Sequence, residues 1–356
     1  MKLGLGLYRH QLDAEHFRFA KQCGCTHLVA HLVDYFRSSR SNQPGDQPVG
    51  DDTGWGLAGD PDRLWTEEEL TALRREVEAA GLRLEAIENC DPAHWHDVLL
   101  DGPRKLAQLE NLKRLIRNVG RAGIPVFGYN FSIAGVAGRV KGPFARGAAE
   151  AVGMDGPFDP PMPRGMVWNM VYDRAAAPGT EPSATADQLW GRLQTFLDEL
   201  LPVAEEAGVT LALHPDDPPM PSIRGQPRLV YQPDLYQRVL DLHPSPRNGL
   251  EFCVGTIAEM TAGDVYEAVE RYSGLGRIAY VHLRNVRGKV PFYRETFIDD
   301  GDVDVLRVLR ILHENGFQGV IIPDHAPQMA CAAPWHAGMA YALGYLRAGL
   351  RSLGLP

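Results

Sequence analysis

The sequence is poor in the features that mark disulfide-rich, nucleic-acid-binding and membrane proteins. Its 356 residues contain only five cysteines, an odd number that argues against a disulfide framework and favours a reducing compartment. No block of Lys and Arg stands out and the formal net charge is −9, which disfavours a nucleic-acid-binding surface. No apolar run approaches the length of a membrane span, and the N-terminus lacks the pattern of a signal peptide. We therefore expect a cytoplasmic protein with no nucleic-acid or membrane partner.

A glycine-rich phosphate loop is also missing after the first candidate strand, which disfavours an open, doubly wound sheet. The sequence does have eight short apolar runs, which alternate with amphipathic segments in the order typical of βα units. These candidate strands are Lys2–Leu7, His27–Val33, Arg83–Asn89, Ile124–Phe131, Val209–Pro215, Gly249–Gly255, Ile278–Asn285 and Gly319–Asp324. Eight such units predict an α/β fold, a closed (β/α)8 TIM barrel in which residues 1–356 form a single domain.

Two long segments interrupt the alternation. Ser38–Arg63 is rich in Gly, Pro and Asp, and Ala134–Ala184 is rich in Gly, Pro and Ala with few helical signals. Both follow candidate strands, so both should lie at the mouth of the barrel, where such folds keep their active sites. Long loops in a compact domain are usually lids or binding loops, or else are disordered. We favour lids for residues 38–63 and 134–184, because they carry aromatic side chains that can pack: Trp55, Phe144, Phe158, Trp168 and Tyr172.

Four side chains that can bind a metal lie at the ends of the last four candidate strands. They are His214, Cys253, His282 and Asp324. A single histidine or cysteine on a strand is more often a buried core residue. The carboxyl ends of barrel strands meet at one mouth, however, so four such residues at equivalent positions predict one shared metal site. Imidazole, thiolate and carboxylate together suit a divalent ion such as Mn²⁺, Fe²⁺, Co²⁺ or Zn²⁺.

Other polar residues close the same strands. Tyr129 and Asn130 end the fourth strand and are candidates for binding substrate hydroxyl groups. Asp216 and Asp217 follow His214 and precede two prolines. These aspartates either orient metal-bound imidazoles or initiate the turn that the prolines enforce. We also keep Asp216 as a candidate substrate contact.

The last two strand ends carry candidates for substrate binding and proton transfer. Arg284 and Asn285 follow His282, and a guanidinium there fits a substrate carboxylate, with a structural ion pair as the alternative. His325 follows Asp324 directly and is our candidate general acid or base, with a packing role as the alternative. Glu295 is a weaker candidate.

At these residues the chain resembles the mannonate dehydratase family, part of the xylose-isomerase-like barrel group. The likeness spans most of the chain. The resembling motifs are LHPDDPP (Leu213–Pro219), FCVG (Phe252–Gly255), HLRNV (His282–Val286), GDVD (Gly301–Asp304) and PDH (Pro323–His325). The resemblance implies a site of the Mn²⁺ type with His214, Cys253, His282 and Asp324 as ligands, and it implies a catalytic His325. The implied reaction is the loss of water from D-mannonate, a sugar acid, which gives 2-keto-3-deoxygluconate. The resemblance also favours a homo-oligomer.

The sequence departs from the family after the eighth strand. Typical members carry a catalytic Tyr there in a GYxxxGR context, whereas an ungapped match places Pro334 at the Tyr and Met339 at the Arg. The loop after the fourth strand also differs, and its Arg139, Lys141 and Arg146 are either an anion contact or a solvated lid edge. Two alternatives therefore stay open beside the dehydratase. One is a metal-dependent sugar isomerase or epimerase, and the other is a relative that binds sugar acids without catalysis.

Overall fold

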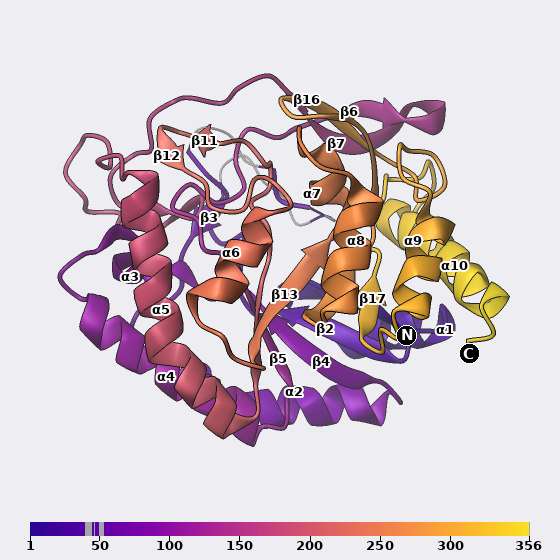
Figure 1. Ribbon diagram of the computed structural model, residues 1–356, viewed down its shortest axis with the longest axis horizontal. Helices are drawn as coiled ribbons and strands as arrows, with labels where there is room; N and C mark the ends of the chain where they lie inside the picture. Colours follow the sequence, from indigo (N-terminus) through magenta and orange to yellow (C-terminus); the bar gives the residue numbers. More distant parts are fainter. Residues whose placement is uncertain (40–44, 46, 50–52, 356) are drawn as a thin grey trace.

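A closed barrel of eight parallel strands forms the centre of the protein. The computed structural model describes residues 1–39, 45, 47–49 and 53–355 (Figure 1). Around the barrel the strands are β1 (Lys2–Leu7), β2 (His27–His31), β4 (Arg83–Glu88), β5 (Val126–Tyr129), β10 (Thr210–Leu213), β13 (Asn248–Cys253), β14 (Ile278–His282) and β17 (Val320–Ile322). Strand β17 pairs with β1 and closes the ring. Each strand falls on one of the eight predicted runs, so the predicted TIM barrel is confirmed.

Helices surround the barrel, and their ends follow local sequence signals. The longer ones are α1 (Ala14–Gln22), α2 (Glu67–Ala79), α4 (Lys105–Arg121), α5 (Ala186–Ala207), α6 (Leu235–Leu242), α8 (Val265–Gly274), α9 (Val305–Glu314) and α10 (Pro334–Ser352), with α3 (His96–Leu100) and α7 (Val254–Glu259) shorter. Helix α2 begins at a capping box in which Thr66 and Glu69 each accept a hydrogen bond from the other's backbone N–H. Helix α5 stops at Gly208, whose φ of 70° is a left-handed conformation that glycine adopts without strain.

The long segments that interrupt the alternation are not plain loops. Residues of the second segment form β6 (Val140–Ala145) and β7 (Ala149–Asp155), which join β15 (Asn285–Lys289) and β16 (Phe292–Thr296) in a four-stranded sheet. Strand β9 (Met170–Val171) pairs with β8 (Met166–Val167) and also with β3 (Gly56–Leu57) of the first segment. Strand β11 (Ser222–Ile223) forms a hairpin with β12 (Gln226–Pro227). These small sheets gather at the top of the view in Figure 1. The two segments also meet through Trp55 and Trp168, whose ring centroids are 5.5 Å apart.

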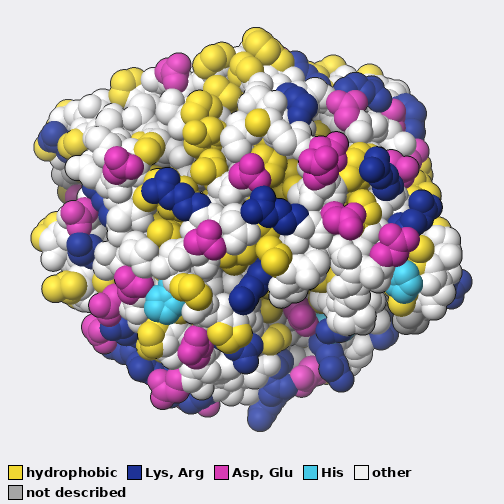
Figure 2. Space-filling view, viewed as in Figure 1, with side chains coloured by type: hydrophobic (Ala, Val, Ile, Leu, Met, Phe, Trp, Pro, Cys, Tyr) yellow, Lys and Arg dark blue, Asp and Glu magenta, His cyan; other side chains and the backbone are white. Residues whose placement is uncertain are grey.

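Two observations bear on the expected partners. Among the described residues, none of the helices combines the length and the apolar character that crossing a bilayer requires. On the face drawn in Figure 2, acidic and basic side chains lie interspersed, a mixed distribution unlike the basic stripe of a nucleic-acid-binding protein.

Candidate metal centre and active site

Each strand of the barrel has, at its last residue or one or two positions beyond it, a residue at the same mouth. In barrel order from β1, with β17 last, these residues are Tyr8, His31, Glu88, Asn130, His214, Cys253, His282 and Asp324. All but Cys253 line one cavity, to which the two long segments add Trp55, Arg139 and Trp168. The mouth therefore concentrates titratable and metal-binding groups where a TIM barrel keeps its active site.

The alternation of side chains along each strand explains why these residues point inward. Val29, Ala86, Ala212, Tyr280 and Ile322 pack together in the interior of the barrel. Since the side-chain period of a strand is two, the residue two positions further on from each of these also faces the barrel axis. Those residues are His31, Glu88, His214, His282 and Asp324.

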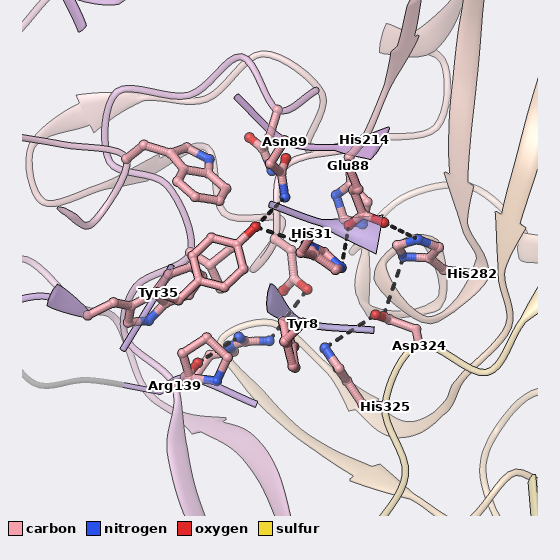
Figure 3. Close-up of a pocket in the computed structure, with 16 residues that line it drawn as sticks. Tyr8, His31, Tyr35, Glu88, Asn89, Arg139, His214, His282, Asp324 and His325 are labelled. Carbon is pink, nitrogen blue, oxygen red and sulfur yellow. Dashed lines mark hydrogen bonds and ion pairs between the residues drawn. The ribbon is translucent and has the colours of Figure 1, made fainter. Parts of the chain in front are cut away.

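The four predicted metal ligands lie together. One ligand atom each of His214, Cys253 and His282 lie within 4.8 Å of one another, and the two imidazole centroids are 5.3 Å apart. Asp324 joins them through its Oδ2 atom, which lies 3.5 Å from Nδ1 of His282 (Figure 3). Two imidazoles, a thiol and a carboxylate thus converge from four neighbouring strands, as the sequence predicted.

The electrostatics of this group favour a bound cation. Burial opposes ionisation of the Cys253 thiol, but Arg284 and the two imidazoles outweigh it and lower the pKa to about 5. The thiolate is therefore the expected form at neutral pH, and thiolate is the form that ligates metals. Burial lowers the pKa of His214, but Cys253 and Glu251 reverse the effect and raise it to about 9. The raised pKa of His214 shows an anionic environment at that imidazole, and the lowered pKa of Cys253 supplies a thiolate beside it. A thiolate, imidazoles and a carboxylate are ligands that divalent ions accept, so the donor set fits a metal.

Two buried glutamates, Glu88 and Glu251, lie on the side of His282 away from Asp324, and the sequence did not predict them. Nε2 of His282 is 3.3 Å from Oε2 of Glu88 and 3.3 Å from Oε1 of Glu251. Burial and the Glu88 carboxylate raise the pKa of Glu251 well above its usual value, whereas His31 and His282 outweigh burial and lower the pKa of Glu88 to about 2. The pair therefore carries one negative charge. It lies at Nε2 of His282, whereas Asp324 lies at Nδ1 of the same ring.

Gly128 makes room for this acidic pair. A Cβ at Gly128 would lie 2.4 Å from Oε2 of Glu251 and 2.3 Å from the hydroxyl of Tyr280. Glu88 ends β4 and Glu251 lies within β13, and no sequence motif connects the two, which is why the pair escaped prediction.

His325 lies beside the metal ligands, as predicted, and lines the cavity. Its Nε2 is 3.3 Å from Oδ1 of Asp324, and its Nδ1 is 3.2 Å from Oε1 of Glu295 and 2.7 Å from the side-chain amide of Gln47. Burial lowers the pKa of His325, but Asp324 and Glu295 outweigh it and leave the pKa raised. The imidazole is thus oriented by its neighbours and can hold a proton for transfer at the cavity wall.

Of the five predicted substrate contacts, Asn130 lines the cavity and the other four have structural roles. Tyr129 precedes it on the strand, so its side chain points outward and packs on Phe196 in the layer between strands and helices. Asp216 accepts hydrogen bonds from the backbone N–H groups of Leu229 and Val230, each at 2.8 Å, and pairs with Arg228. The expectations for Tyr129 and Asp216 as substrate contacts are therefore corrected.

Arg284 and Asn285 are buried, and both side chains bond to other parts of the chain. Arg284 donates to Glu259 at 2.6 Å and to Asp217 at 2.9 Å, and its Nε lies 3.3 Å from Asp324. Leaving a buried charge of this kind unpaired costs about 3–5 kcal/mol, so these carboxylates hold the guanidinium and it is not offered to a ligand. The side-chain amide of Asn285 donates to the carbonyls of Ile298 and Val303 at 3.0 and 2.9 Å. For Arg284, the geometry therefore supports the structural ion pair rather than a contact with a substrate carboxylate.

Arg139 occupies the place that was expected for Arg284. It lines the cavity, and its Nη2 donates to the carbonyl of Pro48 at 3.2 Å. Its nearest carboxylates are more distant, with Asp217 at 3.8 Å and Glu295 at 3.9 Å. The buried Nε has no hydrogen-bond partner among the described residues. The sequence left open whether this loop provides an anion contact or a solvated lid edge. Arg139 fits an anion contact and not a solvated edge, because its side chain is buried.

The fold and the site together define a (β/α)8 barrel with a group of potential metal ligands at its mouth. A xylose isomerase domain protein from Planctomyces limnophilus shares the fold, with a TM-score of 0.55 and 13% identity over 99% of this chain and 98% of that chain. A D-tagatose 3-epimerase-like protein does so with a TM-score of 0.57 and 13% identity over 99% of this chain and 98% of that chain. At such identities the likeness concerns the fold alone.

The family model of D-mannonate dehydratase matches residues 33–139 and 182–348. This chain belongs to the mannonate dehydratase family, a family of hydro-lyases. The mannonate dehydratase of Streptococcus suis (strain 05ZYH33) is 34% identical over 278 residues, which are 74% of this chain and 75% of that protein. Mannonate dehydratase 2 of Halalkalibacterium halodurans is 30% identical over 280 residues, which are 74% of this chain and 79% of that protein.

A solved structure agrees with this assignment. The crystal structure of mannonate dehydratase from Streptococcus suis serotype 2 has a TM-score of 0.73 and 26% identity, and the match covers 100% of this chain and 95% of that chain. The residues between the two parts of the family match, 140–181, contain β6, β7, β8 and β9. The family match therefore leaves out most of the second long segment.

Proposed function

We propose that this protein is a metal-dependent dehydratase that converts D-mannonate to 2-keto-3-deoxy-D-gluconate and water. The observation that carries the proposal is the convergence of His214, Cys253 and His282, with ligand atoms within 4.8 Å, beside Asp324 and His325 in a chain of this family. These residues stand next to a cavity lined by Arg139, whose Nε has no hydrogen-bond partner among the described residues and is available to an anionic substrate.

We propose His214, Cys253, His282 and Asp324 as the residues that hold the ion, with Mn²⁺ as the expected metal and Fe²⁺, Co²⁺ or Zn²⁺ able to take its place. When bound, the ion supplies positive charge that stabilises the negative charge developing on the substrate carboxylate as the C2 proton leaves. Glu88 and Glu251 keep the His282 ring in place from the side opposite Asp324. His325 moves a proton between its imidazole and the hydroxyl group at C3.

The remaining cavity residues bind and enclose the substrate. Arg139 is placed to pair with the substrate carboxylate, and Asn130 is placed to bind a hydroxyl group. Trp55 and Trp168 come from the two long segments, residues 38–63 and 134–184, and form an apolar wall that excludes water. We propose that these segments act as lids of a single barrel domain.

The direct test is turnover by the full-length protein. Apoprotein is loaded with Mn²⁺, Fe²⁺, Co²⁺ or Zn²⁺ and incubated with D-mannonate and a panel of other aldonic acids. A thiobarbiturate assay then measures the 2-keto-3-deoxy product. The proposal expects product from D-mannonate with at least one metal and none from the apoprotein. A panel that gives no product with any acid and any metal rejects the dehydratase function.

An Arg139→Met variant tests the carboxylate contact. Loss of the guanidinium removes a charge-assisted pair with the substrate, which is worth about 1.5–3 kcal/mol. We therefore expect KM for D-mannonate to rise by about 10-fold to 100-fold. We expect the metal content to stay unchanged. Arg146→Met is the matched control, since Arg146 lies in the same segment but pairs with the exposed Asp299. A KM within twofold of wild type for Arg139→Met contradicts the assignment.

A second candidate function is a sugar isomerase or epimerase with the same metal site. It is favoured by the departure at Pro334, which begins helix α10 where the family motif has its Tyr. Without an acid that protonates the departing hydroxide, the enediolate takes up a proton at carbon again and no water is lost. Solvent deuterium incorporated at C2 of recovered sugar without any keto-deoxy product supports this function and opposes the dehydratase.

We also propose a cytoplasmic homo-oligomer. The described chain has five free cysteines, of which Cys25, Cys90 and Cys253 are buried, as expected in a reducing compartment. Sedimentation velocity at several protein concentrations measures the oligomeric state.

A further inference from the structure

A dehydration moves two protons. Besides His325 and the proposed metal ligands His214 and His282, the cavity lining contains one further histidine among the described residues, His31. His31 is the last residue of β2, and its side chain, 12% exposed, lines the cavity together with Tyr8 and Tyr35. Figure 3 shows that His31 and His325 project into the same space from separate strands. Strand β1 lies between β2 and β17, so the two imidazoles enter the mouth from strands two positions apart in the barrel.

Two neighbours, Tyr35 and Tyr8, hold the ring of His31. Its Nδ1 is 3.0 Å from the hydroxyl of Tyr35, and that hydroxyl also accepts a hydrogen bond from the side-chain amide of Asn89 at 3.1 Å. The ring of Tyr8 packs against the imidazole with a centroid distance of 5.0 Å. These contacts fix the orientation of the ring and engage one of its two nitrogens.

The other nitrogen is placed to receive a proton. Nε2 of His31 lies 3.5 Å from Oε1 of Glu88, beyond the range of about 2.7–3.2 Å of an ordinary hydrogen bond. When Nδ1 donates to Tyr35, Nε2 carries the lone pair, and a proton that arrives there meets a neighbouring carboxylate. Burial lowers the pKa of His31, and Glu88 offsets this only in part, so the neutral, proton-accepting form is present near neutral pH.

We propose that His31 is the general base of the reaction. The inference rests on the proposed function. The C2–H bond of the sugar acid breaks, and its proton goes to Nε2 of His31. The released electron pair forms the C2=C3 bond as the C3–O bond breaks, and the departing hydroxide takes a proton from His325 to become water. The enol then gains a proton at C3 and loses one from its C2 hydroxyl, which yields the 2-keto-3-deoxy acid. Glu88 stabilises the imidazolium of His31, and Tyr35 is a positioning residue.

The test compares wild type with His31→Asn, His31→Gly, Tyr35→Phe and a matched control. The control is His27→Asn, on the same strand but at its amino end, where His27 lies near Glu85. Each Mn²⁺-loaded protein is assayed for metal content, kcat and KM with D-mannonate, and the isotope effect with C2-deuterated mannonate. We expect His31→Asn to keep its metal, to lose about 10²–10⁴-fold in kcat, and to leave KM within a few-fold.

The isotope effect and chemical rescue separate proton abstraction from a structural role. Removal of the base makes C2–H cleavage slower than every other step, so the deuterium isotope effect on kcat should rise in His31→Asn. Free imidazole should restore part of the turnover of His31→Gly and none of that lost in Tyr35→Phe. We expect a smaller loss for Tyr35→Phe, about 10-fold, and wild-type turnover for His27→Asn.

Three results would overturn the inference. One is a kcat for His31→Asn within threefold of wild type. Another is an unchanged isotope effect together with no rescue of His31→Gly. The third is a wild-type protein that dehydrates no aldonic acid, which removes the proposed function and the base with it. The first two leave the dehydratase standing, so the failure of this inference is distinguishable from the failure of the function.

Discussion

Replacement of His325 by Asn should lower kcat for D-mannonate by about 10²–10⁴-fold while bound metal stays at the wild-type level. His325 lies beside the ion-binding group rather than inside it, with its Nε2 3.3 Å from Asp324 and its Nδ1 3.2 Å from Glu295. Its raised pKa keeps a proton available near neutral pH, and Asn offers no such proton. The loss should therefore fall on turnover, with KM changed little.

The measurement pairs metal analysis with steady-state kinetics on the same protein preparation. His336→Asn is a suitable control, because His336 lies on α10 and packs on Phe19, with a centroid distance of 4.7 Å, outside the cavity lining. It should keep wild-type turnover. A His325→Asn protein that is fully active would show that the acid or base is another residue.

The barrel was predictable because its signals are local. Each strand is a short apolar run, and each helix begins or ends with residues such as Thr66 or Gly208 whose geometry is intrinsic to them. The small sheets over the mouth lacked such signals. Strand β7 pairs with β16, and residues about 140 positions apart, such as Gly153 and Arg294, meet there. A Gly-rich and Ala-rich segment does not reveal a partner so distant in the sequence.

The ligands were predictable for a related reason, and the substrate contacts were not. His214, Cys253 and His282 end or directly follow strands, so topology alone brings them together. Arg284 lies beyond the end of β14, where the backbone turns away from the strand direction and the side chain meets Glu259 and Asp217. The direction of its side chain depends on contacts with α7 and with the loop after β10, which no local pattern encodes. Glu88 and His31 follow the alternation rule as the ligands do, but they lie in the half of the chain where no motif drew attention to strand ends.

The second prediction with a large expected effect concerns the proposed metal ligands. Replacement of Cys253 by Ser, of His214 by Ala or of Asp324 by Ala should each weaken metal binding by more than about 100-fold, since loss of a ligand exceeds the 10–100-fold cost of losing an outer contact. Turnover should fall in parallel, because the ion provides the charge that C2–H cleavage requires. Metal retained after desalting measures the affinity, and titration of the apoprotein with Mn²⁺ gives the change in Kd.

Cobalt distinguishes direct ligation by Cys253 from a general loss of structure. Co²⁺ bound to a thiolate gives a charge-transfer absorption in the near ultraviolet, so wild type should show this band and Cys253→Ser should lack it even at saturating Co²⁺. Cys90→Ser is the matched control, because Cys90 is also buried near the mouth but bonds only weakly to the carbonyl of Asp91, at 3.8 Å. It should keep both the band and the metal. Because the thiol of Cys253 has a pKa of about 5, the band should also persist at neutral pH without added base. Stoichiometric metal in both Cys253→Ser and His214→Ala would place the ion elsewhere, and the pair Glu88 and Glu251 on the other face of His282 would then be the site to examine.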